Sequence, residues 1–246
     1  MAGFTKLSGT LLFYNFVKAA MARIEAKKVL DFGAGRGGGL LTPIPWLRRL
    51  QDLRELGATV WAADLDPAVE NHPASDHRIV LQPDAPLPFP DGHFDVIVSD
   101  WTFEHVEKPE QTAAELLRVL RPGGYICART ANRFGYVKLA GSAVPNSLHT
   151  RALASVQPDR KHEDIFPTVY AMNSVRQVRE LFPSCSVFWY RDNSEPAYYF
   201  NNSAIYRFFK WLHWILPEMF ATTICFFIRK SPSKAEYLGE RDDVSG

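Results

Sequence analysis

Short runs of apolar residues alternate with longer amphipathic stretches along most of the chain. Seven runs have the length and the aromatic or β-branched content of buried strands: residues 27–33, 57–66, 77–85, 94–101, 125–130, 185–192 and 221–230. Stretches of helical spacing separate many of these runs, so the strands are expected to pair in parallel through right-handed crossovers. The pattern predicts an α/β protein with a doubly wound sheet.

Helical spacing is clearest in three of the intervening stretches. Residues 45–56 place leucines on neighbouring turns, residues 109–124 run from a proline to Pro-Gly-Gly, and residues 173–183 follow a capping Asn or Ser. The apolar N-terminal stretch is expected to be a helix that leads into the first strand. A signal peptide is the less favoured interpretation, because Lys18 interrupts the region where cleavage would occur.

Composition narrows the class of protein. The chain of 246 residues has a net charge of +1, which argues against a nucleic-acid binder with a wide basic face. Its three cysteines are far apart and predict free thiols in a reducing, cytoplasmic setting. Because the sequence has no uncharged apolar stretch of about 18 residues, no transmembrane helix is expected.

A glycine-rich segment, "VLDFGAGRGGG" at 29–39, follows the first predicted strand. Glycines at this place let a backbone approach a nucleotide-type ligand at the carboxyl ends of the strands. The spacing of Gly33, Gly35 and Gly38 fits NAD as well as S-adenosylmethionine. Asp64, which ends the second run, suits the ribose hydroxyls of either cofactor, so this segment alone leaves both open.

Further motifs separate the two cofactors. Asp31 stands where a dinucleotide-binding strand would carry an apolar residue, and Asp84 with Ala85 ends the third run. "LPFPDGHFDVI" follows at 87–97 and "LRPGG" at 120–124. In this order the motifs resemble the class I S-adenosylmethionine-dependent methyltransferase family, in the branch similar to methyltransferase type 11. The resemblance covers residues 29–130.

The resemblance implies a Rossmann-like, seven-stranded and mostly parallel sheet with an antiparallel last strand. It implies S-adenosyl-L-methionine as cofactor, with Asp31 holding the amino group of its methionine portion, Asp64 its ribose and Asp84 its adenine amine. The implied cofactor residues are Asp31, Gly33, Ala34, Gly35, Gly37, Asp64, Leu65, Asp84, Ala85, Asp100 and Trp101. The segment between Gly37 and Asp64 is longer than the family usually shows, which predicts an extended loop here.

One methyltransferase domain is expected over residues 1–235. Its cofactor half would span 25–130, an excursion on the acceptor side 131–172, and a flexible tail 236–246. No metal site is expected, because the adjacent residues of "KHEDIF" rarely face one centre.

His105 is the candidate general base, since it follows the fourth strand on the cofactor side and an imidazole titrates near neutrality. A histidine that only fixes the loop is the alternative, and Glu104 beside it is expected to be a solvent or capping residue. Candidate acceptor contacts in and around the excursion are Asn132, Arg133, Tyr136, His149 and His162. Cationic and aromatic groups of this kind favour a hydroxylated small molecule such as a sugar or a glycan precursor.

An aromatic helix is expected over 203–217, between the last two strands. Such a helix could lie at a membrane surface, cover the sheet, or form a homodimer contact; burial in the protein or in a dimer is the favoured interpretation. The favoured function is O-methylation of a sugar or glycan-type hydroxyl. Methylation of a quinone or other lipid at the membrane, and a non-catalytic cofactor-binding subunit, are the alternatives.

Overall fold

The computed structural model describes residues 9–136, 168–193 and 202–232. Its strands are β1 (Lys28–Phe32), β2 (Thr59–Asp64), β3 (His77–Val80), β4 (Phe94–Asp100), β5 (Leu120–Ala131), β6 (Cys185–Asp192) and β7 (Thr223–Lys230). Its α-helices are α1 (Gly9–Arg23), α2 (Pro45–Gln51), α3 (Pro109–Val119), α6 (Val175–Leu181) and α7 (Ser203–Ile215).

All seven of these strands form one sheet in the order β3-β2-β1-β4-β5-β7-β6. β1 lies parallel between β2 and β4, and β5 continues the parallel set beyond β4. β7 pairs antiparallel with both of its neighbours, β5 and β6. The predicted fold, a Rossmann-like and mostly parallel sheet with an antiparallel last strand, is confirmed.

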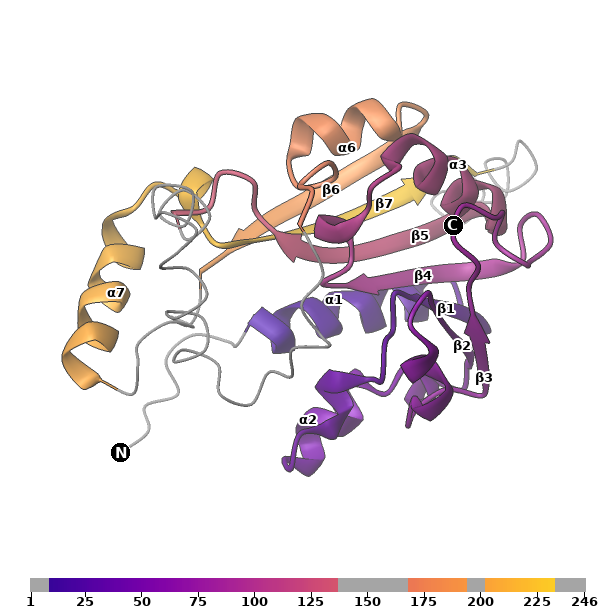
Figure 1. Ribbon diagram of the computed structural model, residues 1–246, viewed down its shortest axis with the longest axis horizontal. Helices are drawn as coiled ribbons and strands as arrows, with labels where there is room; N and C mark the ends of the chain where they lie inside the picture. The colour runs from indigo at the N-terminus through magenta and orange to yellow at the C-terminus, as the bar shows by residue number, and fades with distance from the viewer. Residues whose placement is uncertain (1–8, 137–167, 194–201, 233–246) are drawn as a thin grey trace, which may run out of the picture.

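Helices cover both faces of the sheet (Figure 1), which explains why its central strands carry few polar residues. On one face Phe13, Val17 and Met21 of α1 are buried against β1, β4 and β5. On the other face Leu116 of α3 and Val178 of α6 join the larger apolar cluster. The carboxyl ends of β1 and β4 lie between these layers. The order of the strands reverses between β1 and β4, and a crevice for a ligand forms at such a point.

Three predicted boundaries are wrong. The helix expected over 45–56 breaks at Asp52, whose backbone is extended, so that α2 is followed by a separate 3₁₀ turn, Leu53–Leu56. The Asp52 carboxylate accepts hydrogen bonds from the Arg54 backbone and guanidinium, which stabilises the break. The third strand ends at Val80 instead of 85, so Asp84 and Ala85 lie in the turn beyond it.

The helix expected over 109–124 ends at Val119, and β5 begins at Leu120. Leu120 is fully buried and pairs with Phe94, and Arg121 forms an ion pair with Asp95 at 2.6 Å. These contacts with β4 draw the residues before Pro-Gly-Gly into the sheet. Tertiary pairing therefore overrides the local helical preference.

α7 belongs to an insertion between β6 and β7. Asp192 at the end of β6 pairs with Thr223 at the start of β7, and the Asn193 side chain accepts hydrogen bonds from the backbone and hydroxyl of Thr222. The two strands thus meet in the sheet while the chain between them departs from it. Figure 1 places α7 beyond the end of the sheet toward which β4 and β5 point.

Candidate functional site

A cavity of about 640 Å³ opens at the carboxyl ends of β1 and β4. The loop after β1 forms one wall, and α1 together with the ends of β4 and β5 forms the opposite wall. The lining residues are Thr10, Tyr14, Asp31, Gly33, Ala34, residues 37–42, Leu47, Gln51, His72, Asp100, Trp101 and Arg129. Of the cofactor residues expected from the sequence, Asp31, Gly33, Ala34, Gly37, Asp100 and Trp101 lie on this cavity.

The loop after β1 is glycine-rich for reasons of internal packing. Gly33 and Gly37 both have positive φ, +74° and +71°, which other residues adopt at a cost. A Cβ at Gly33 would stand 2.2 Å from the Thr102 hydroxyl oxygen, and one at Gly37 would stand 2.6 Å from Cδ of Pro73. The missing side chains at these two positions therefore admit neighbouring parts of the protein itself, which hold the loop against the cavity.

Asp64 ends β2 and holds the same loop. One carboxylate oxygen accepts the backbone N–H of Gly35 at 2.7 Å, and the other accepts that of Asp66 at 2.8 Å. The backbone N–H of Leu65 also contributes a hydrogen bond, and the carboxylate keeps acceptor capacity for a ligand hydroxyl. Burial raises the pKa of Asp64, although these hydrogen bonds oppose the rise.

Asp31 presents a buried carboxyl group to the cavity. Burial raises its pKa to about 7, and the charges of Asp100 and Asp64 add to the rise. The nearest histidine nitrogen, Nε2 of His72, lies 3.5 Å away. Burial and the charges of Arg78 and Arg54 lower the pKa of His72 to about 4, so the imidazole is neutral at pH 7 and supplies no compensating positive charge.

Asp100, in contrast, is paired with a cation. Nε and Nη2 of Arg129 each donate to the carboxylate at 2.6 Å, a bidentate contact, and the Tyr14 hydroxyl donates to it at 3.2 Å. Arg129 also donates to the Thr10 hydroxyl at 2.9 Å. This cluster ties α1 to the ends of β4 and β5, and the sequence analysis identified only Asp100 among its members.

Trp101 follows Asp100 with a positive φ of +63°. Its ring lies 5.4 Å from the guanidinium carbon of Arg129, within cation–π distance. A positive φ in a bulky residue is costly and is retained where surrounding contacts fix it. The backbone hydrogen bond from Trp101 to Arg129, at 2.8 Å, is one such contact.

The other expected cofactor residues and the expected base lie outside the lining of this cavity: Gly35, Asp64, Leu65, Asp84, Ala85 and His105. Leu65 is 58% exposed, Asp84 is an exposed residue that pairs with Lys108 at 2.6 Å, and Ala85 follows it in the turn. His105 ends a short 3₁₀ turn, Phe103–His105, just past β4. The structure therefore brings the methionine-side residues together around the cavity and leaves the adenine-side residues on the open surface beside it.

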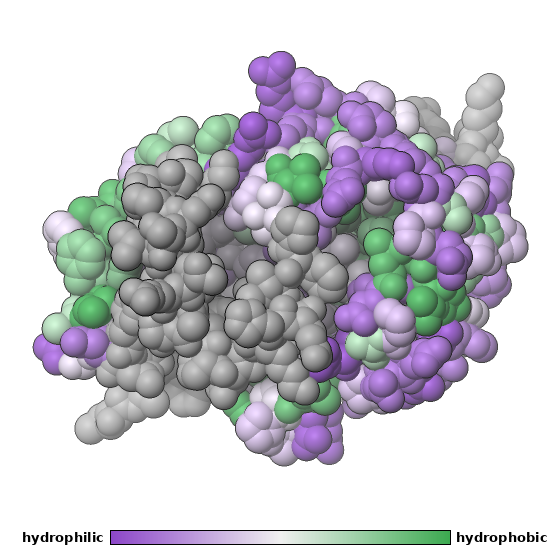
Figure 2. All heavy atoms as spheres, in the orientation of Figure 1, coloured by the Kyte–Doolittle hydropathy of each residue, from purple (hydrophilic) through white to green (hydrophobic). Residues whose placement is uncertain are grey.

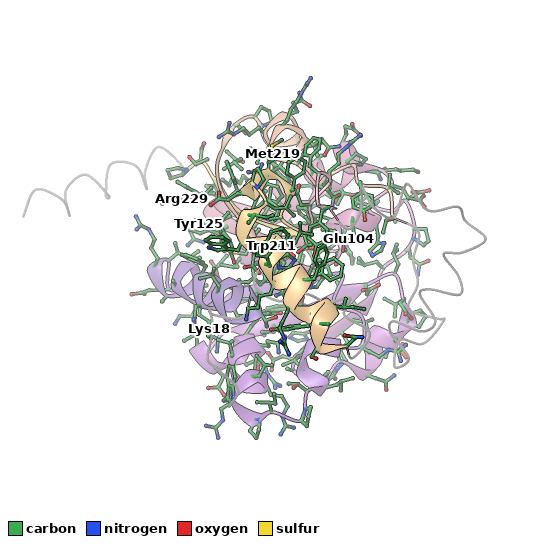
Figure 3. All side chains as sticks on the ribbon, turned by 90° about the vertical axis from the view of Figure 1, so that its left-hand side faces the viewer. Lys18, Glu104, Tyr125, Trp211, Met219 and Arg229 are labelled. Carbon is green, nitrogen blue, oxygen red and sulfur yellow. The ribbon has the colours of Figure 1, made fainter. Side chains whose placement is uncertain are left out.

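Glu104 is buried, which corrects the expectation of a solvent or capping residue. Its carboxylate accepts the Thr130 hydroxyl hydrogen bond at 2.6 Å, and its backbone carbonyl accepts N–H groups of Val169 and Tyr170. Burial raises its pKa. Figure 3, which views the molecule from the side of α7, shows Glu104 beside that helix in projection.

The residues expected to meet an acceptor have varied surroundings. Asn132 is buried and donates to the carbonyls of Met219 and Ala221 at 2.9 and 2.7 Å, so its amide stabilises the chain entering β7. Arg133 is exposed and donates to the Tyr170 carbonyl at 3.4 Å. Tyr136 contacts α7 and is described below; His149 and His162 lie outside the described residues, as do the predicted tail and residues 137–167 of the excursion.

Comparison with known proteins assigns the part of the chain that builds this cavity. Residues 30–128 match the family model described as a methyltransferase domain. The chain is also 30% identical to a probable S-adenosylmethionine-dependent methyltransferase of Mycolicibacterium smegmatis, over 55% of this chain and 49% of the relative. The matched range thus holds most of β1, all of β2 to β4, the glycine-rich loop and most of β5, whereas α1 and α7 lie outside it.

Two relatives and one solved structure illustrate the similarity. The chain is 31% identical to a ubiquinone biosynthesis O-methyltransferase of Thiobacillus denitrificans over 46% of this chain and 47% of the relative. It is 35% identical to a fatty-acid O-methyltransferase of Mycolicibacterium smegmatis over 44% of this chain and 38% of the relative. The chain spans less than half the length of these curated relatives.

The fold resembles that in a complex between the Haloferax volcanii Trm112 methyltransferase activator and a methyltransferase. The TM-score is 0.53 at 18% identity, over 90% of each chain. Identity at this level supports the fold of the methyltransferase domain and no finer property.

Proposed function

We propose that the protein transfers a methyl group from S-adenosylmethionine to an oxygen atom of a lipid-like small molecule. The observation that carries the proposal is the cavity after β1, where Asp31 faces the space beside the glycine-rich loop. Among the described residues, the ion pair of this carboxyl group is with His72, whose low pKa leaves it neutral. A group of this kind fits an ammonium ligand, which S-adenosylmethionine has in its methionine portion. The cofactor itself supplies an activated methyl group.

The other contacts of the chain suit the rest of the cofactor. Asp64, fixed by Gly35 and Asp66, retains acceptor capacity for a ribose hydroxyl. Leu65 offers an exposed apolar surface for adenine. Asp84, in the turn after β3, would accept a hydrogen bond from the adenine amine in place of its ion pair with Lys108. On the methionine side, Arg129 is engaged with Asp100, which leaves the Asp31 carboxyl group for the ammonium of the cofactor.

Catalysis in this proposal depends on alignment. Methyl transfer is an in-line displacement. Holding the acceptor atom in line with the methyl group and the sulfur lowers the activation barrier by up to roughly 7–11 kcal/mol. His105, just past β4, is the proposed base that accepts the proton of a hydroxyl acceptor. The Glu104 contacts with Thr130 and with the backbone of residues 169–170 would fix the turn that carries His105.

The relatives favour a lipid over a sugar as acceptor, since their names specify a quinone pathway and a fatty acid. The sugar acceptor expected from the cationic and aromatic residues stays a prediction, and the experiment below compares sugars with lipids as acceptors. Cytoplasmic location is likewise proposed from the free cysteines.

Two measurements test the function. Calorimetric titration with S-adenosylhomocysteine should show micromolar binding, and NAD should produce no heat. Transfer of a labelled methyl group from S-adenosylmethionine is then followed with hydroquinones, fatty acids and free or nucleotide-linked sugars. Labelling of quinols or fatty acids alone supports the proposal; labelling confined to sugars overturns the acceptor class, and a response to NAD without S-adenosylhomocysteine binding overturns the enzyme class.

A further inference from the structure

α7 presents aromatic side chains to solvent. None of its residues is buried, and Phe208, Trp211, Trp214 and Ile215 are exposed, with Trp214 at 79%. Figure 2 shows hydrophobic surface on the side of the molecule where α7 lies. The described part of the chain leaves this face of α7 uncovered, and the expected burial in the protein or in a dimer stays a prediction. A group of exposed, adjacent large apolar side chains is typical of an interaction site.

The side of α7 opposite its exposed aromatic residues contacts Tyr136, and these contacts fix the rotation of the helix about its axis. The Tyr136 hydroxyl is hydrogen-bonded to Nε2 of His213, and its ring stacks on Phe209 at 6.0 Å. Phe209 and His213 are four residues apart and therefore share one side of the helix. Trp211 and Trp214 project from the other side, so the exposure of the tryptophans follows from this packing.

Charge on the helix is of one sign. The sequence of α7, SAIYRFFKWLHWI, contains Arg207 and Lys210 and no carboxylate. Arg207 is exposed on the same side as Trp211 and Trp214. Tryptophan with a neighbouring cation suits the boundary between lipid headgroups and acyl chains, where the ring is half immersed and the cation meets phosphate.

The position of α7 relative to the cavity also supports a membrane contact. α7 lies beyond the carboxyl ends of β4 and β5, the end of the sheet at which the cavity opens (Figures 1 and 3). Among the described residues no helix is long and apolar enough to cross a membrane. An interfacial contact through α7 would turn the cavity end of the molecule toward the lipid.

We propose that α7 docks the protein onto the surface of an anionic phospholipid membrane through Phe208, Trp211 and Trp214, with Arg207 on the headgroup phosphates. Docking requires no cofactor and no methyl transfer, so this inference goes beyond the proposed function and can fail independently of it. It supplies a route by which an apolar acceptor reaches the site without passing through water.

The test is sedimentation of the full chain with vesicles of phosphatidylcholine alone or mixed with phosphatidylglycerol, with tryptophan fluorescence recorded in parallel. The native protein should bind the anionic vesicles with a blue-shifted emission and bind neutral vesicles weakly. Trp211→Ser/Trp214→Ser should weaken binding by at least about tenfold. Arg207→Gln should weaken binding to the anionic vesicles and leave the residual binding to neutral vesicles unchanged.

Trp46→Ser is the matched control, because Trp46 is 55% exposed on α2, away from α7. Its vesicle binding should equal that of the native protein, and circular dichroism should show that all variants are folded. Absence of vesicle binding by the native protein, or equal losses with Trp46→Ser, overturns the inference. A native dimer that the α7 variant converts to a monomer, without vesicle binding, would assign the surface to a second copy instead.

Discussion

Replacement of Asp31 by Asn should raise the free energy of unfolding at pH 8 and weaken the binding of the cofactor. The carboxyl has an ordinary pKa of 3.8, and burial with the charges of Asp100 and Asp64 raises it to about 7. That difference corresponds to about 4 kcal/mol of destabilisation once the group is ionised. Because 19% of the side chain remains exposed, this figure is an upper bound.

The sign follows from linkage. A carboxyl whose pKa is raised on folding contributes stability that is complete below about pH 4 and is lost as pH rises through 7. Asp31→Asn should therefore have a higher free energy of unfolding than the native protein at pH 8, by up to about 4 kcal/mol. At pH 4 the two proteins should be equally stable.

Affinity should move in the opposite direction. The ionised carboxylate attracts the ammonium group of the cofactor, so the native protein should bind S-adenosylhomocysteine more tightly as pH rises from 6 to 8, with release of a proton near pH 7. Asp31→Asn should bind weakly at every pH and release no proton. Calorimetry in buffers of different ionisation enthalpy measures the proton count directly.

Urea unfolding at pH 4 and pH 8 supplies the stability measurement. Asp91 is exposed, precedes the amino end of β4 and pairs with Arg118 at 2.8 Å. Asp91→Asn therefore controls for the loss of a negative charge together with a surface ion pair, and its effect should not change between the two pH values. A loss of stability in Asp31→Asn at pH 8, or a gain that does not change with pH, would refute the assignment of a strained carboxyl to this position.

Three further predictions concern the remaining site residues. Asp64→Ala should weaken S-adenosylhomocysteine binding by about tenfold or more in calorimetry, because Gly35 loses its acceptor along with the ligand hydroxyls; unchanged affinity would remove Asp64 from the site. Arg129→Met should lower the free energy of unfolding by about 3–5 kcal/mol, since it leaves the Asp100 carboxylate without its cation. The double variant Arg129→Met/Asp100→Asn should regain part of this loss in the same urea assay, and equal losses would contradict the pairing. His105→Gln should lower kcat by roughly 10²- to 10⁴-fold with little change in cofactor affinity if the imidazole is the base; a kcat within a few-fold of the native value would leave it as a loop residue.

The sequence pattern was sufficient to find every parallel strand, because each contains an apolar run, although it misplaced the end of β3 and the start of β5. It failed where long-range contacts decide, as at Leu120, which local spacing assigns to a helix and pairing with Phe94 draws into β5. The same limit applies to the site. Asp31 and the glycines are adjacent in sequence and were found, whereas Tyr14 and His72 reach the cavity from other elements.

Arg129 could have been predicted. It stands in "YICART", an apolar run, and an arginine in a buried strand requires a carboxylate. Asp100 ends the neighbouring strand, and the two residues are in register. A search for charge pairs across adjacent predicted strands would have identified this ion pair.

The hydrogen bonds between Asn193 and Thr222 have a consequence for how the protein can diversify. β6 and β7 are joined at the base of the insertion regardless of what the chain does between them. The entropic cost of closing a loop grows only slowly with its length. Segments of different length and polarity can therefore replace α7 without a change of register in the sheet, so the same sheet can acquire a different surface beside its cavity by exchange of one inserted segment.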